Sequence, residues 1–125
     1  MLIGYARVST DDQDLRLQRG ELQRAGCERL FEEKLSGARR DRPELQRMLD
    51  HLRADDVVVI TRLDRLARST RDLLDIAERL NTIGAGLRSL AEPWADTTSP
   101  AGRMVLTVFA GIAEFERDLI RERTS

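Results

Sequence analysis

The chain has 125 residues, of which 41% are hydrophobic and 34% are charged. These values are typical of one folded domain and exclude a disordered chain. No apolar run is long enough to span a membrane, and no basic region precedes a long apolar stretch as in a signal peptide. The formal net charge of -1 argues against a general nucleic-acid coat, although it leaves room for a local basic patch.

The chain holds one cysteine and one histidine, and this excludes several kinds of chemistry. Cys27 has no partner for an internal disulfide, which predicts a reducing, cytoplasmic location. His51 follows Asp50 in a predicted helix, where we expect a surface side chain, so zinc binding and a Ser-His-Asp triad are disfavoured. No glycine-rich nucleotide motif and no tight carboxylate cluster for magnesium is present.

The first half of the chain alternates between strand and helix patterns. We expect a strand at 1–7, a helix from Thr10 to Gly26, a weaker strand at 27–31, an exposed loop at 33–42 and a helix from Pro43. Thr10 and Gln13 have the spacing of a capping box.

The second half continues the alternation. We expect a strand at 56–61 that is buried on both faces, a helix capped by Ser69 or Thr70 and stopped by Gly84 and Gly86, a strand at 87–90, a loop at 92–98 and a helix from Ser99-Pro100 to the end. This order predicts an α/β fold with a mainly parallel central sheet flanked by helices.

The last predicted helix has a wider apolar face than one small domain needs. Its main stripe is Met104, Val108, Ile112, Phe115 and Leu119, and it is widened by Val105, Phe109, Ala113 and Ile120. A second copy of the same helix is the simplest partner for that surface. Residues 123–125 contain no Gly or Pro stop, so we expect a longer natural protein.

Residues 5–10 (YARVST) lie where a strand meets a helix, the usual ligand edge of an open α/β sheet. Strand alternation places Tyr5, Arg7 and Ser9 on one side. A guanidinium, a hydroxyl and helix amides there favour an anion such as phosphate. The alternative is that Ser9 only caps the helix, but Thr10 is the better cap and leaves Ser9 available as a nucleophile.

A second cluster, residues 61–69 (TRLDRLARS), follows the most buried strand. Its arginines suit the neutralisation of a phosphodiester and of the charge that develops during attack, and Asp64 suits orientation of an arginine or proton transfer. The alternative is a solvated, salt-bridged helix entrance. A third basic segment, 36–42, is weaker evidence, because plain surface charge explains it as well.

Three segments in register, 5–10, 36–37 with 41–42, and 63–68 (LDRLAR), resemble the resolvase/invertase family of serine recombinases. Residues 114–124 (EFERDLIRERT) resemble the long oligomerisation helix of that family. Ala67 stands where many relatives have Gly, which we expect to change loop flexibility rather than chemistry.

The resemblance implies a resolvase-like catalytic domain that cuts and rejoins DNA. Ser9 would attack the scissile phosphodiester and form a 5′-phosphoserine, while Arg7, Arg65 and Arg68 would bind the phosphate. The supporting residues would be Gln18, Asp64, Ser36, Arg42 and Tyr5. Dimers and tetramers, joined through the last helix, would cut two duplexes and exchange ends, with no metal cofactor and no ATP.

The resemblance also implies a domain plan. Residues 1–100 would form the catalytic domain and 101–125 the start of the oligomerisation helix, with the DNA-binding domain absent from this chain, in keeping with its net charge. Two other functions stay open: a dimerisation and anion-binding module without catalysis, and a small phosphatase-like hydrolase. The sequence does not distinguish resolution from inversion, integration or transposition.

Overall fold

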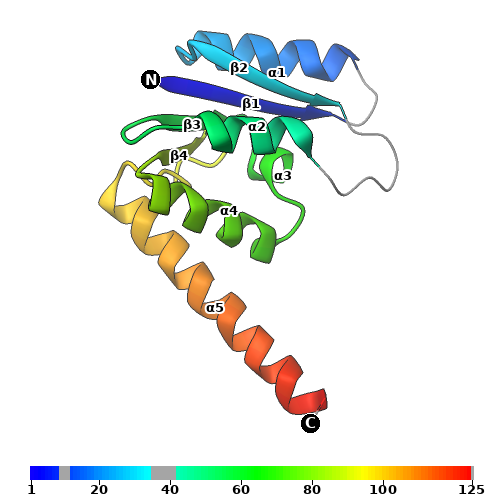
Figure 1. Ribbon diagram of the computed structural model, residues 1–125, viewed down its shortest axis with the longest axis vertical. Coiled ribbons are helices and arrows are strands. Elements are labelled where there is room, and N and C mark those ends of the chain that lie inside the picture. Colours follow the sequence, from blue (N-terminus) through cyan, green and yellow to red (C-terminus); the bar gives the residue numbers. More distant parts are fainter. Residues whose placement is uncertain (9–11, 35–41, 125) are drawn as a thin grey trace.

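A computed structural model describes residues 1–8, 12–34 and 42–124. Four parallel strands form one sheet in the order β2-β1-β3-β4, and helices cover both of its faces (Figure 1). The strands are β1 Leu2–Val8, β2 Arg29–Lys34, β3 Val57–Ile60 and β4 Gly86–Ser89. The helices are α1 Asp12–Arg24, α2 Pro43–His51, α3 Leu63–Leu66, α4 Thr70–Ile83 and α5 Pro100–Thr124. The predicted α/β class with a parallel sheet is confirmed.

Several predicted boundaries differ from the structure by one to three residues, and two of these differences have a clear cause. β2 runs to Lys34, so Glu33 and Lys34 belong to the strand and not to the predicted loop, because β1 continues to Val8 and pairs with them. Gly86 begins β4, opposite Val57, and does not end the preceding helix. The predicted cap at Thr10 lies outside the described residues.

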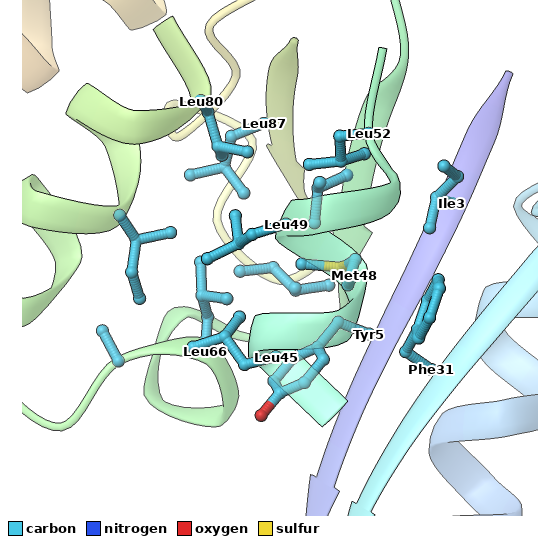
Figure 2. Packing of buried hydrophobic residues seen from close by; sticks show 14 of the residues in the cluster. Ile3, Tyr5, Phe31, Leu45, Met48, Leu49, Leu52, Leu66, Leu80 and Leu87 are labelled. Carbon is cyan, nitrogen blue, oxygen red and sulfur yellow. The ribbon is translucent and has the colours of Figure 1, made fainter. Parts of the chain in front are cut away.

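The two faces of the sheet bury different sets of side chains. Ile3 and Tyr5 point into the larger cluster, where they meet residues of α2, α3 and α4 (Figure 2). Ala6 and Val59 point the other way, toward Leu22 of α1. Alternate residues of β1 therefore serve opposite layers, and the odd-numbered ones face the helices α2 to α4.

The helix ends follow local chemistry. Ser69 is the cap of α4, since its Oγ accepts a hydrogen bond of 3.1 Å from the amide of Asp72. Gly84 ends α4 with a φ of 90°, a left-handed conformation that favours glycine. The prediction of Ser69 or Thr70 is thus resolved in favour of Ser69.

α5 extends away from the body of the domain (Figure 1). Its side chains Met104, Val108, Ile112 and Phe115 are between 48% and 64% exposed, which is a large apolar area for a surface. Within the described residues, no helix is both long and apolar enough to cross a membrane.

Candidate active site

The predicted site residues gather at the carboxyl ends of β1 and β3. Arg7 lies near the end of β1, and Asp64, Arg65 and Arg68 lie on or just after α3, which follows β3. The predicted nucleophile Ser9 and the predicted supporting residue Ser36 lie outside the described residues. The described site therefore consists of the arginines and supporting residues at these two strand ends, and each of them is placed in turn below.

Arg7 is held by main-chain oxygens. Its Nε donates to the carbonyl of Arg65 at 3.1 Å, and its Nη2 donates to the carbonyl of Asp64. Burial lowers the pKa of Arg7, and the positive charges of Arg42, Arg68 and Arg65 lower it further. Because carbonyls orient the guanidinium without neutralising it, Arg7 keeps a positive charge that suits an anion.

Gln18 of α1 forms hydrogen bonds with the main chain of β1 beyond the point where pairing with β3 ends. Odd residues of β1 direct their main-chain groups toward β3, as the bond from the Val57 amide to the Met1 carbonyl shows. Pairing with β3 stops at Gly4, so the N–H and C=O of Arg7 lie beyond it. The buried side-chain amide of Gln18 accepts from that N–H at 3.3 Å and donates to that C=O at 3.1 Å. Gln18 thereby fixes the backbone that carries Arg7.

Arg65 connects α3 to the first turn of α1. Its Nη2 lies 3.1 Å from Oδ2 of Asp14, and Gln18 donates to the same oxygen at 3.2 Å. The Nε of Arg65 is buried and has no hydrogen-bond partner within the described parts of the chain. One donor of this guanidinium is thus spent on a carboxylate, while another is unsatisfied and is suited to an incoming acceptor.

Arg42 ties the start of α2 to the start of α4. Its Nη2 bonds both oxygens of Asp72 at 2.8 and 2.9 Å, and its Nη1 donates to the carbonyl of Leu66 at 2.6 Å. Asp72 also accepts from the amide of Arg68 at 3.0 Å. This partly buried ion pair, in which one nitrogen of Arg42 contacts both oxygens of Asp72, fixes the turn that presents Arg68.

Tyr5 reaches the site from the core. Its hydroxyl donates to Oε2 of Glu33 at 2.7 Å, and burial, followed by the bond to Glu33, raises the pKa of Tyr5 well above its usual range. Glu33 also accepts from the amides of Glu44 and Leu45 at 3.0 Å each. The phenol therefore stays protonated and anchors a buried carboxylate beside the arginines.

Asp64 and Arg68 face outward. The Asp64 carboxylate is 69% exposed and lies 3.4 Å from Nε of Arg62, so it orients an arginine on the solvent side. Arg68 is exposed at the junction of α3 and α4 and lies close enough to Arg7 to affect its pKa. Ala67 has a φ of -126° and a ψ of 148°, an extended conformation open to any residue, so the absence of Gly there leaves the backbone unstrained.

Sequence reasoning missed three carboxylates, Asp14, Glu33 and Asp72. Glu33 had a detectable signal, because α2 begins at Arg42-Pro43 and Arg42 makes no side-chain capping bond. The helix therefore needs an acceptor from elsewhere, and Glu33 shares the inward face of β2 with Phe31. Asp14 and Asp72 had no such signal, since their arginine partners lie 51 and 30 residues away in the sequence.

The described site is an anion-binding arrangement. Arg42, Arg65 and Arg68 each lie within electrostatic reach of Arg7, and Arg42 and Arg65 also pair with the carboxylates of Asp72 and Asp14. Among the described residues, no three metal-ligating side chains gather into a group that would hold an ion. Such an arrangement suits a phosphate group and the extra negative charge of its transition state.

Comparison with known proteins identifies the family. The family model named "Resolvase, N terminal domain" matches residues 2–125. The chain belongs to this family. It is 51% identical over 124 residues to the serine recombinase gin of Escherichia phage Mu, and 46% identical over 125 residues to the transposon Tn917 resolvase of Enterococcus faecalis.

These family members are longer than the chain. The match covers 99% of the chain and 64% of the phage Mu protein, and 100% of the chain and 67% of the Tn917 resolvase. Among solved structures, the N-terminal catalytic domain of TP901-1 integrase superposes with a TM-score of 0.81 at 31% identity. That match covers 94% of this chain and 97% of that domain. The resolvase-like fold predicted from the sequence is confirmed.

Proposed function

We propose that this resolvase-family chain is the catalytic part of a site-specific DNA recombinase whose nucleophile is Ser9. The observation that carries the proposal is the setting of Arg7, a partly buried guanidinium held by two carbonyls and surrounded by three further arginines. That setting favours a phosphodiester, which supplies the missing negative charge. The names of its relatives, serine recombinase and resolvase, support DNA as the substrate.

The reaction is a reversible phosphoryl transfer. The Oγ of Ser9 forms a bond to the phosphorus of the scissile phosphodiester, and the bond from phosphorus to the 3′ oxygen breaks. The leaving 3′ oxygen takes up a proton and becomes a hydroxyl, while the serine hydroxyl loses one. In the reverse direction a 3′-hydroxyl attacks the 5′-phosphoserine, so the bond energy is retained and no ATP is consumed.

The arginines divide the electrostatic work. Arg7, Arg65 and Arg68 neutralise the phosphate. The supporting group consists of Tyr5, Gln18, Ser36, Arg42 and Asp64. Of these, Gln18 positions Arg7 and Arg42 positions Arg68 through the contacts described above.

The domain plan and the assembly belong to the same proposal. Residues 1–100 form the catalytic α/β domain, and 101–125 begin an oligomerisation helix whose exposed apolar side chains pair with another copy. Homodimers and homotetramers then bring the cleaved ends together, and DNA as the substrate places the protein in the cytoplasm. In sedimentation, Phe115→Glu is expected to weaken association, while Thr107→Glu on the same helix is the matched control.

The test of the nucleophile is a covalent adduct. The protein, at its full natural length, is incubated with a nicked suicide substrate, and the adduct is located by mass spectrometry. The adduct is expected on Ser9, absent in Ser9→Ala and retained in the neighbouring control Thr10→Ala. An adduct that persists in Ser9→Ala contradicts the assignment.

The same assay separates the other two functions. A dimerisation and anion-binding module associates and binds DNA but forms no adduct at any serine. A phosphatase-like hydrolase turns over simple phosphate esters, whereas a recombinase is not expected to do so. No adduct together with ester turnover would replace the proposed function.

A further inference from the structure

A small cavity lies beside the arginines, at the junction of α3 and α4. It has a volume of about 240 Å³. Leu63, Ala67 and Leu73 contribute apolar wall, and Trp94 from the loop before α5 adds an aromatic side. The polar lining residues are Arg68, Asp64, Ser69 and Thr70. The volume is smaller than that of a usual small-molecule pocket, so the cavity suits a group of about the size of one nucleotide's sugar and base.

Trp94 is held at this cavity by a firmly anchored loop. The carboxylate of Glu92 accepts from the amide of Leu63 at 3.0 Å and from the hydroxyl of Ser89 at 2.6 Å. One residue beyond Trp94, Ala95 is fully buried and its carbonyl accepts from the amide of Ser89 at 3.0 Å. Although these hydrogen bonds hold Glu92 and Ala95 on either side of it in the sequence, Trp94 is 42% exposed. The loop thus presents a large aromatic surface to solvent at a defined place.

The cavity is electrostatically continuous with the candidate active site. Arg68 lines the cavity and is also one of the charges that lower the pKa of Arg7. Arg62 and Arg71 are exposed on either side of Arg68 along the chain. Arg62, Arg68 and Arg71 outnumber the one carboxylate of the lining, Asp64, so this side of the cavity favours the phosphate backbone of a DNA strand bound at Arg7.

We propose that Trp94 is a DNA-contacting residue that packs against the nucleotide next to the phosphate bound by the arginines. This inference rests on the proposed function and adds a substrate contact to it. The cavity wall is mostly apolar, so it holds sugar and base by packing on the indole and does not read base edges. An aromatic platform beside a cationic edge is the usual arrangement for contacts that tolerate any sequence.

The tryptophan itself reports on the contact. Trp94 is the only tryptophan in the chain, so intrinsic emission comes from this position alone. The probe is a short single-stranded DNA oligonucleotide. The comparison probe is an oligonucleotide of the same length that lacks all bases. We expect the DNA to quench the emission and the base-free strand to quench it much less. If neither strand changes the emission, the inference is wrong.

Substitutions supply the second readout, measured by the anisotropy of a fluorescein-labelled copy of the same oligonucleotide. Trp94→Ala is expected to weaken binding about 5- to 150-fold, the range for one aromatic–base contact. Trp94→Phe is expected to keep most of the affinity. Thr107→Ala is the control, because Thr107 is also exposed but lies on α5, outside its apolar stripe. Equal affinities for Trp94→Ala and the unmodified protein would overturn the inference.

A second copy of the chain is the competing occupant. If it covers Trp94, the emission changes with protein concentration in the absence of DNA, and that result overturns the inference. The proposed function has its own readout, the Ser9 adduct. Suppose that the unmodified protein forms the adduct and that Trp94→Ala forms it equally well at limiting DNA. The role of Trp94 is then wrong, while the proposed function stands. Failure of the adduct in the unmodified protein removes the proposed function.

Discussion

Glu33 is the residue on which the geometry of the site most depends, and its replacement by Gln is the sharpest test. The side chain is 1% exposed and accepts three hydrogen bonds, from the Tyr5 hydroxyl and from the amides of Glu44 and Leu45. These amides belong to the first turn of α2, whose positive end favours a carboxylate. Glu33 therefore caps a helix from a neighbouring strand.

The expected loss in the free energy of unfolding follows from the three hydrogen-bond donors that face Glu33. A Gln side chain keeps one oxygen and turns the other into an NH₂ group, which faces a donor wherever it is placed. At least one hydrogen bond to a charged acceptor is lost and one donor is left without a partner, a loss of about 2–4 kcal/mol in the free energy of unfolding. For a domain of this size, that lowers the midpoint of thermal unfolding by roughly 10 °C.

The assay is thermal and urea unfolding followed by circular dichroism. Glu32→Gln is the matched control, since it makes the same change of charge one residue away, where the side chain pairs with the exposed Arg19. We expect Glu32→Gln to shift the midpoint far less. A double mutant with Tyr5→Phe is expected to be less than additive, because both changes remove the same bond. Equal shifts for Glu32→Gln and Glu33→Gln would refute the reasoning.

Three further predictions follow from other contacts. Since the pKa of Tyr5 is raised above its ordinary 10.0, only the unfolded state loses this proton easily, so stability is present below about pH 10 and falls above it. In urea unfolding, Tyr5→Phe is expected to show a weaker alkaline decline, and an unchanged decline would contradict this. Gly102→Ala is expected to destabilise by about 2 kcal/mol or more, because its Cβ would collide with a main-chain oxygen of the preceding loop. Gly111→Ala, with open space around it, is expected to stabilise α5 by about 1 kcal/mol in the same melts, and equal responses would refute the contrast. Asp14→Asn releases Arg65 from its ion pair and is expected to tighten DNA binding and steepen its salt dependence; weaker binding would instead show that Asp14 positions Arg65.

The sequence predicts the strands of this fold where burial alone determines them. β3 is an unbroken apolar run and was predicted within a residue at each end. The end of β2 was missed because Glu33 and Lys34 are charged, and Glu33 is stabilised there by donors that lie far along the chain. The helix α3 has only four residues, too few for an apolar periodicity to be visible.

The same distinction applies to the site. Arginines at the carboxyl ends of parallel strands meet at one edge of a sheet, which predicts that Arg7 lies beside the basic cluster at 61–69. The resemblance to serine recombinases is what singles out Arg65 and Arg68 within that cluster. Their carboxylate partners were not predicted, because the pairing of Arg65 with Asp14 depends on how α1 packs over that edge. Local pattern therefore finds the cations, and only the tertiary structure shows which of them are already neutralised.

This division among the arginines bears on function. Asp72 pairs with Arg42 and Asp14 pairs with Arg65, whereas the side-chain acceptors of Arg7 in the described parts of the chain are the carbonyl oxygens of Asp64 and Arg65. Burial, and then the repulsion from Arg42, Arg68 and Arg65, lower the pKa of Arg7, while Gln18 and α3 fix this guanidinium in place. A phosphate at this point relieves that repulsion. Any anion that binds there therefore stabilises the fold as it binds, because it offsets the repulsion among the arginines.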